Sequence, residues 1–280
     1  MSDTAKQFPA IRVLGTIGWI AQGWVIGLLG IEAEATPFFI GAGVSIALGI
    51  YCLVLPNTPP ASADKKVSVA DVLGLDALSM FKNRSFAVFV ISSMLVCIPL
   101  SFYYGFTNLF LNELDVTNAA GKMTFGQMSE IFFMLVMPFF FRRLGVKYML
   151  VVGILAWATR YFLFAFGNND SAVWMLLIGI ILHGVCYDFF FVTGQIYVDK
   201  KASDDIRSKA QGLITFATLG VGMFIGTWLS GKVVENYATA EAAIPHDWKS
   251  IWVVPAVLSL VLLVAFWALF NDKVDKEPEA

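Results

Sequence analysis

The chain has 280 residues, of which 58% are hydrophobic and 14% are charged, and its formal net charge at pH 7 is -2. Soluble proteins carry about 25% charged residues, so this composition excludes an ordinary soluble protein and predicts a polytopic membrane protein. No basic patch with interleaved aromatic residues occurs, which excludes nucleic acid as a partner. Cys52, Cys97 and Cys186 lie in apolar segments without the spacing of metal ligands, so we expect no metal ion or other cofactor.

Long apolar segments recur along the whole chain. A membrane-spanning helix needs about 20 mostly apolar residues, and eight segments meet this requirement. In chain order they cover approximately residues 11–30, 36–55, 85–111, 123–141, 146–166, 172–198, 210–232 and 250–270. The sequence therefore predicts an all-α polytopic membrane bundle of eight transmembrane helices.

The connection from Pro56 to Arg84 differs from the others in composition. It begins with PNTPPASADKK, a Pro/Ser/Ala linker, and continues with VSVADVLGLDALSMF, which we interpret as a short interfacial helix. This connection separates two predicted helices from six. We therefore divide the chain into a two-helix unit (1–55), a cytoplasmic linker (56–84), a six-helix half (85–272) and a cytoplasmic tail (273–280).

Lysine and arginine residues are concentrated in alternate connections. The basic connections contain Lys65, Lys66, Lys82, Arg84, Arg142, Arg143, Lys147, Lys200, Lys201, Arg207, Lys209, Lys273 and Lys276. The intervening loops contain Lys122, Lys232 and Lys249. Positively charged loops stay on the cytoplasmic side of a membrane, so we expect both termini in the cytoplasm. We expect the protein to be a multi-pass protein of the plasma membrane, specifically a bacterial inner membrane.

Four strongly ionisable residues lie within or at the edge of apolar segments: Arg12, Glu130, Arg160 and Asp188. Such a group costs about 2.5 to 3.5 kcal/mol at the centre of a membrane helix, so it is rarely kept without a partner, a cavity or a function. A buried carboxyl group changes between its protonated and charged forms when its hydration or pairing changes. We therefore expect Glu130 and Asp188 to face a shared aqueous cleft and to couple proton movement to a conformational change. Gln127 precedes Glu130 by three residues and shares its helix face.

A structural alternative remains for both acids. Glu130 could form a static ion pair with Arg160 and so fix the order of the helices. Asp188 could do the same with Arg12.

Aromatic residues with polar neighbours suggest a site for a planar ligand. Trp19 lies near Thr16, and Tyr187 precedes Asp188. A flat ring at either position could stack on a ligand while its neighbour makes hydrogen bonds. His183 lies one turn before Tyr187, where it is either a packed side chain or part of the same site.

Two pairs of small residues are spaced four apart: Gly23 with Gly27, and Gly222 with Gly226. Small residues at this spacing let membrane helices approach closely. We expect helix contacts at both pairs.

Several stretches of the sequence match one known family. They are FPAIRVLGTIGW, LGLDALSMFKN, QMSEIFFMLVMPFFFRRLGVK, AWATRYFLFAFG, CYDFFFVTGQIYVDKKASDDIRSKAQG and GVGMFIGTWLSGKVVE. Together they resemble the nucleoside:proton symporters of the major facilitator superfamily, over nearly the whole chain. The resemblance implies two six-helix halves that expose a central substrate alternately to either side. The eight predicted helices look like the fifth to twelfth of such a transporter, so we expect this chain to be a fragment that lacks the first four.

The resemblance also implies a binding site and a function. The positions that line the nucleoside site in the family carry Arg12, Thr16, Gln127, Glu130 and Tyr187 here, and Trp19 replaces another aromatic residue. The sequence departs from the family at Ser101, Tyr104 and His183, which leaves the choice of substrate open. The expected function is proton-coupled nucleoside uptake, with a nucleoside, a proton and the lipid bilayer as partners. No protein partner follows from the sequence.

Two other functions are compatible with part of the sequence. A carrier of another small polar solute, such as a sugar, would fit the departures from the family pattern. An intramembrane aspartyl protease is a remote alternative, because Tyr187-Asp188 resembles the first motif of these enzymes. The second motif is missing, since the nearest string is Gly74-Leu75-Asp76 in the predicted linker. We therefore predict a transporter and not an enzyme.

Overall fold

The computed structural model describes residues 4–57, 74–239 and 245–271, with side chains described from residue 14 onward. In these ranges the chain is helical, apart from turns and one isolated bridge between Ala238 and His246. The helices are α1 (Thr4–Leu29), α2 (Thr36–Cys52), α4 (Arg84–Glu113), α5 (Ala119–Phe166), α6 (Val173–Tyr187), α7 (Thr193–Lys201), α8 (Arg207–Thr215), α9 (Met223–Asn236) and α10 (Trp248–Leu269). A 3₁₀ helix, η1 (Leu75–Lys82), precedes α4, and two π-helical segments are η2 (Asp188–Val192) and η3 (Phe216–Gly222). The predicted all-α class is confirmed.

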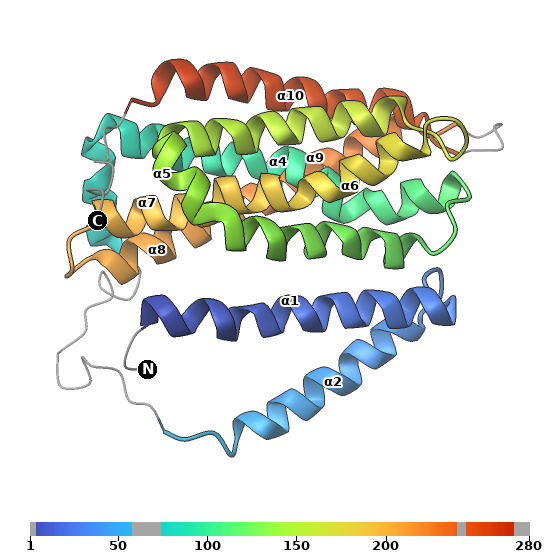
Figure 1. The fold of residues 1–280 in the computed structure, drawn as a ribbon, viewed down its shortest axis with the longest axis horizontal. Coiled ribbons are helices and arrows are strands. Elements are labelled where there is room, and N and C mark those ends of the chain that lie inside the picture. Colours follow the sequence, from blue (N-terminus) through green and yellow to red (C-terminus); the bar gives the residue numbers. More distant parts are fainter. Residues whose placement is uncertain (1–3, 58–73, 240–244, 272–280) are drawn as a thin grey trace.

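α5 is a hairpin of two helical arms. Its 48 residues are interrupted at Gly145, whose φ of 70° and ψ of 175° are not helical. A positive φ costs glycine little because it has no Cβ. Figure 1 shows the first arm (residues 119–144) and the second arm (146–166) running in opposite directions. The predicted segments 123–141 and 146–166 therefore fall on separate arms.

The two π-helical segments lie inside long helices. η2 joins α6 to α7, and η3 joins α8 to α9, so each predicted single helix contains a π-helical turn in its middle. Such turns are often found at functional sites. With these joins, five helices in the described part of the chain are long and apolar enough to cross a membrane, and α1 and α2 are shorter apolar helices. The total of eight transmembrane helices stays a prediction.

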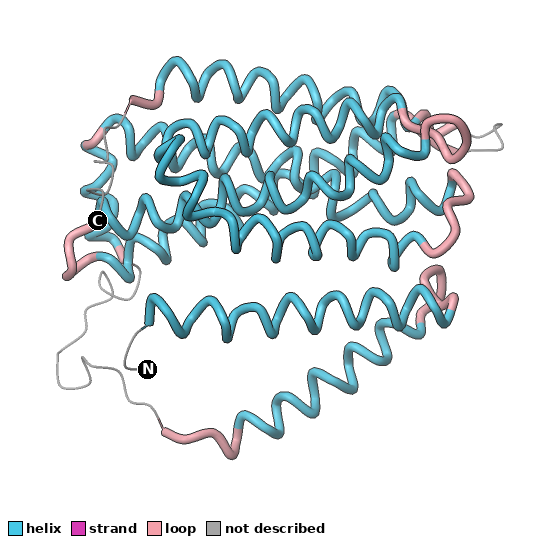
Figure 2. Tube along the Cα trace, in the orientation of Figure 1, coloured by secondary structure: helices cyan, strands magenta, loops and turns pink. Residues whose placement is uncertain are grey.

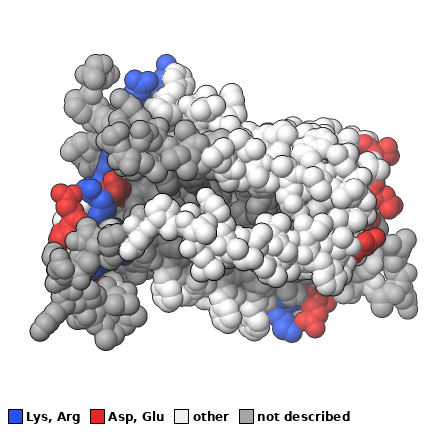
Figure 3. Space-filling view, turned by 90° about the horizontal axis from the view of Figure 1, so that it is seen from below, with Lys and Arg blue, Asp and Glu red and all other residues white. Residues whose placement is uncertain are grey.

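The helices form one bundle with α1 and α2 on one side of it (Figures 1 and 2). α1 packs against α5, whereas α2 has no buried residue. α1 begins and α10 ends at the same end of the bundle (Figure 1). Viewed from the side of α1 and α2, most charged side chains lie towards the two ends, a few lie at the lower edge, and the broad face between them is free of charged side chains (Figure 3). This distribution is typical of a membrane-spanning bundle.

Glycine residues permit the closest helix contacts. A Cβ added to Gly23 would lie 2.6 Å from Thr124 Cγ2 on α5. A Cβ on Gly222 would lie 2.6 Å from the Met94 carbonyl oxygen on α4, and one on Gly226 would lie 2.8 Å from the Cys97 carbonyl oxygen. The close approach predicted at these small residues is confirmed.

The predicted interfacial helix is described only in its second part. Residues 58–73 lie outside the described residues, and the part that follows is η1, which starts after Gly74. Asp76 of η1 forms an ion pair of 2.5 Å with Lys209 of α8. This contact holds the end of the linker against the first turn of α8.

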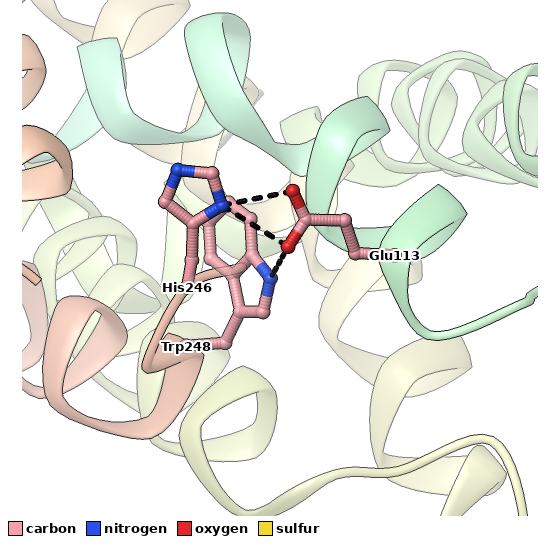
Figure 4. Close-up of polar contacts among 3 residues, drawn as sticks. All are labelled: Glu113, His246 and Trp248. Atoms are coloured by element: carbon pink, nitrogen blue, oxygen red, sulfur yellow. Dashed lines mark hydrogen bonds and ion pairs between the residues drawn. The ribbon is translucent and has the colours of Figure 1, made fainter. Parts of the chain in front are cut away.

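A partly buried acid, Glu113, joins the end of α4 to the start of α10 (Figure 4). The indole Nε1 of Trp248 donates to Glu113 Oε2 over 2.8 Å, and His246 Nδ1 lies 2.8 Å from Glu113 Oε1. The Trp248 ring also packs on Phe110, with 5.2 Å between ring centroids. Glu113 therefore connects a helix end, a loop and the aromatic core.

Replacing Glu113 with alanine is expected to lower the free energy of unfolding by about 1 to 3 kcal/mol, because the Trp248 N–H would be left buried without an acceptor. Thermal unfolding in detergent measures this effect. The matched control is Glu235→Ala, which breaks an exposed ion pair with Lys232 and should cost less than about 1 kcal/mol. Equal melting temperatures for the two variants would contradict the prediction.

Candidate functional site

A cavity of about 600 Å³ lies between α1, α4, the first arm of α5, α6 and α9. Its lining residues are Gly15, Thr16, Trp19, Tyr104, Met123, Gln127, Glu130, His183, Tyr187 and Met223. Small-molecule sites typically enclose about 300 to 1,000 Å³ and combine apolar walls with a few polar groups. The cavity therefore has the size and composition of a site for a small organic molecule.

The structure brings six predicted site residues together at this cavity. They are Thr16, Trp19, Gln127, Glu130, His183 and Tyr187. The side chain of the seventh, Arg12, lies outside the described residues. Among the departures from the family pattern, Tyr104 and His183 line the cavity, whereas Ser101 is buried and donates to the Cys97 carbonyl oxygen over 2.8 Å. The roles of these residues in binding stay predictions.

Tight packing between α5 and α6 sets the position of the polar wall. The Gly184 N–H donates to Ser129 Oγ over 2.9 Å, and this Oγ lies 2.5 Å from the Ile181 carbonyl oxygen. A Cβ added to Gly184 would lie 2.6 Å from the Glu130 backbone nitrogen. Because the two backbones are this close, the α5 residues around Glu130 and the α6 residues around His183 meet at one cavity.

His183 lies in a group of aromatic rings. Its ring stacks on Tyr103 with 5.1 Å between centroids and 19° between planes, and lies edge-on to Tyr104 at 6.1 Å. The Tyr187 ring is 5.8 Å away. The side chain of His183 is 2% exposed, so the histidine is both packed and part of the cavity wall.

Glu130 and Asp188 do not share one cleft. Glu130 is 8% exposed and lines the cavity. Asp188 is fully buried at the start of η2 and does not line the cavity. The expectation that both acids face a common cleft is therefore wrong for Asp188. Its neighbour Tyr187 occupies the cavity wall instead, because successive helical residues point about 100° apart.

Arg160 is not the partner of Glu130 in the described part of the chain. Its Nε donates to the Gly179 carbonyl oxygen over 2.9 Å, and its Cζ lies 3.9 Å from the centroid of the Tyr103 ring. The alternative of a static Glu130–Arg160 ion pair is therefore wrong. The alternative pair of Asp188 with Arg12 involves a side chain outside the described residues.

Two smaller cavities adjoin the central one. One, of about 330 Å³, shares Trp19, Tyr104 and Gln127 with it. The other, of about 100 Å³, shares Tyr104 and Tyr187 and lies against both π-helical segments. Tyr104 lines all three cavities, so it stands where they meet.

Glu32, in the turn between α1 and α2, contacts α4 and α5 at one end of this row of cavities. Its Oε2 accepts hydrogen bonds from Asn108 Nδ2 at 3.2 Å and from the Ala120 N–H at 3.1 Å. Asn108 and Ala120 line the cavity of about 330 Å³. One carboxylate thus holds the α1–α2 turn against the two helices that form this end.

Sequence reasoning missed Tyr103 and Met223. Both lie in long apolar segments, where periodicity does not separate a lipid-facing residue from a cavity-facing one. The adjacent pair Tyr103-Tyr104 carries two hydroxyl groups into an apolar helix, and this was the available signal. Met223 follows η3 directly, and nothing in the sequence around it indicates that it faces a cavity.

Comparison with known proteins identifies the family. Residues 1–275 match the family described as nucleoside H+ symporter. The chain is 42% identical to the putative nucleoside transporter YegT of Escherichia coli K12, covering 96% of this chain and 66% of YegT. It is 37% identical to the nucleoside permease NupG of the same organism, covering 99% of this chain and 68% of NupG. It thus spans about two thirds of the length of these relatives.

The fold agrees with solved structures of nucleoside transporter NupG. A crystal structure of a single-residue variant of NupG superposes with a TM-score of 0.86 at 38% identity, covering 96% of this chain and 69% of that one. A second NupG crystal structure gives a TM-score of 0.82. Sequence and fold therefore agree that the chain belongs to the nucleoside H+ symporter family, a family of multi-pass membrane transporters and not of enzymes.

Proposed function

We propose that this chain carries the nucleoside site of a proton-coupled nucleoside transporter that works by alternating access. The observation that carries the proposal is the cavity of about 600 Å³, in which Trp19 and Tyr187 offer aromatic faces and Gln127 and Glu130 offer polar groups. A nucleoside has a flat base and a polar ribose, so it needs both kinds of wall. The names of two relatives, nucleoside permease NupG and xanthosine permease, support this substrate class.

Each wall has a proposed role. Trp19 and Tyr187 stack on the base. Arg12, Thr16, Gln127, Glu130 and His183 make hydrogen bonds to the base and the ribose. Such bonds give sharp selectivity, because a solute that lacks a partner leaves desolvated groups unpaired.

Proton coupling is assigned to Glu130 and Asp188. Glu130 can exchange a proton with water in the cavity that it lines. Asp188, buried beside Tyr187, would respond to a change in the packing of η2. We further propose a bacterial inner membrane location, with both termini cytoplasmic and the chain divided at the linker into a two-helix unit and a six-helix half.

Replacing Tyr187 with leucine is expected to weaken uridine binding by about tenfold, because stacking of a base on an aromatic ring contributes about 1 to 3 kcal/mol. Isothermal titration of the detergent-purified chain measures the dissociation constant. Tyr187→Phe is the control and should bind within about twofold of the unchanged chain, since it keeps the aromatic face. Equal affinities for the leucine and phenylalanine variants would exclude stacking at this position.

Competition separates the nucleoside carrier from a carrier of sugars. Uridine, uracil and a hexose are each tested against bound radiolabelled uridine. A nucleoside site requires displacement by unlabelled uridine and not by the hexose. Binding of the hexose that survives Trp19→Leu and Tyr187→Leu would favour the sugar carrier, because a sugar has no aromatic face.

A further inference from the structure

Arg160 is a buried cation that forms no ion pair with a carboxylate of the described residues. The side chain is fully buried in the second arm of α5, and its Nη1 and Nη2 atoms make no hydrogen bond to any described residue. Its Nε donates a hydrogen bond to the carbonyl oxygen of Gly179, on α6. An uncompensated buried charge is strongly destabilising, so a position that keeps one requires an explanation beyond packing.

A contact with the Tyr103 ring offsets part of the cost of burying the Arg160 charge. The guanidinium carbon lies 3.9 Å from the centroid of the Tyr103 ring, which is within the range of a cation–π interaction. The same ring stacks on His183 at 5.1 Å and, nearly parallel, on Phe164 at 6.4 Å. Tyr103 therefore contacts both the buried arginine and a residue of the cavity wall.

The hydrogen bond to Gly179 acts on the same part of α6. Gly179 lies four residues before His183, so the two positions are one turn apart on one helix face. Arg160 thus holds the α6 backbone one turn from His183, while Tyr103 holds the imidazole ring itself. Arg160 does not line the central cavity, whereas His183 does.

Several buried polar atoms around His183 have no hydrogen-bond partner among the described residues. Tyr103 Oη, Gln127 Oε1 and His183 Nδ1 are buried and make no hydrogen bond to a described residue. A neutral imidazole offers one donor and one acceptor, and either nitrogen can pair with a single carbonyl or N–H group on the edge of a nucleobase. Such an edge could be recognised only if the ring is held in one orientation.

We propose that Arg160 is a positioning residue for nucleoside binding, which holds His183 in its binding orientation through Tyr103 and Gly179. Arg160 does not touch the substrate; it fixes the stack that presents the imidazole to the base. The inference rests on the proposed function, because it assigns His183 a contact with the nucleoside. It adds Arg160 and Tyr103 to the residues that determine specificity.

A double-mutant cycle tests this role. Dissociation constants for uridine are measured by isothermal titration for the unchanged chain, Arg160→Gln, His183→Gln and the double variant. Each single change is expected to raise the dissociation constant about tenfold, which corresponds to about 1.4 kcal/mol. The double variant should be no weaker than the weaker single variant, because residues that act as one unit are not additive. Additive effects, or an Arg160→Gln affinity within twofold of the unchanged chain, would overturn the proposal.

Two further variants separate positioning from stability. Arg160→Lys keeps a cation near Tyr103 and should recover part of the lost affinity. Glu113→Ala is the matched control, because it removes the acceptor of the Trp248 N–H and Glu113 does not line the central cavity. It should lower the melting temperature without changing the dissociation constant.

If Arg160→Gln does not fold, Tyr103→Leu takes its place in the cycle with His183→Gln. This variant removes the ring that joins Arg160 to His183 and should show the same non-additive loss; an unchanged dissociation constant or an additive loss would overturn the proposal. Failure of the unchanged chain to bind uridine would overturn the proposed function instead. The two failures are therefore distinct.

Discussion

Replacing Glu130 with glutamine is expected to reduce uridine accumulation driven by a pH gradient to the level of protein-free liposomes. Glu130 is the one acidic residue among the described side chains that line the central cavity. Glutamine keeps the size of the side chain and, like protonated glutamate, both donates and accepts hydrogen bonds, but it cannot release a proton. Substrate binding should therefore survive while coupling to the proton gradient is lost.

The experiment uses proteoliposomes of the chain with an imposed pH gradient. Uptake of radiolabelled uridine and the fluorescence of an internal pH-sensitive dye are recorded together, and binding is measured separately by titration. Glu235→Gln is the control, because Glu235 is an exposed acid on α9 paired with Lys232. Retained uphill accumulation in Glu130→Gln, with uridine-driven proton entry, would remove Glu130 from the coupling mechanism.

Asp188→Asn in the same assay distinguishes the two acids. If Asp188 acts with Glu130, uridine-driven proton entry is lost although the residue does not line the cavity. Unchanged proton entry removes Asp188 and leaves it a structural role at the start of η2.

The helices were predictable from the sequence because the physical rule is simple. Apolar segments long enough to cross a bilayer become helices, since only internal hydrogen bonds satisfy their backbones in lipid. The π-helical segments were not predictable, because a shift from i→i+4 to i→i+5 bonding at Asp188 or Phe216 leaves no pattern in the side chains. The basic residues around Gly145 ended one predicted segment at residue 141 and began the next at residue 146, and the turn in α5 lies between these two segments.

The site was predictable to a lesser degree. Gln127 and Glu130 were found because polar groups in apolar helices need a reason to be there, and Thr16 was found as the polar neighbour of Trp19 and from the family resemblance. The same reasoning placed Asp188 in the cavity and was wrong, because polarity does not report the direction in which a side chain points. Tyr103 was missed since its polar atom is a single hydroxyl on an apolar ring. Which residues share a cavity depends on how helices pack, and that depends on small residues such as Gly184.

Replacing Gly184 with alanine is expected to destabilise the protein by about 3 kcal/mol or more, which is at or above the upper end of ordinary overpacking costs. The added Cβ would lie 2.5 Å from the Ser129 carbonyl carbon and 2.6 Å from the Glu130 nitrogen. Both are backbone atoms, so no side-chain rotation relieves the clash and α6 must move away from α5. The movement would also break the hydrogen bond from the Gly184 N–H to Ser129 Oγ.

Gly231→Ala is the matched control for this variant. Nothing lies within 4 Å of a Cβ at Gly231, which is also inside a helix. Glycine costs a helix about 1 kcal/mol relative to alanine, so this change should raise the melting temperature slightly. Thermal unfolding in detergent, followed by size-exclusion chromatography, compares the two variants. Gly184 lies where α6, which carries His183, contacts α5, which carries Glu130. Any Gly184→Ala protein that folds should therefore also bind uridine more weakly. An unchanged melting temperature and an unchanged affinity would show that this helix contact does not set the site.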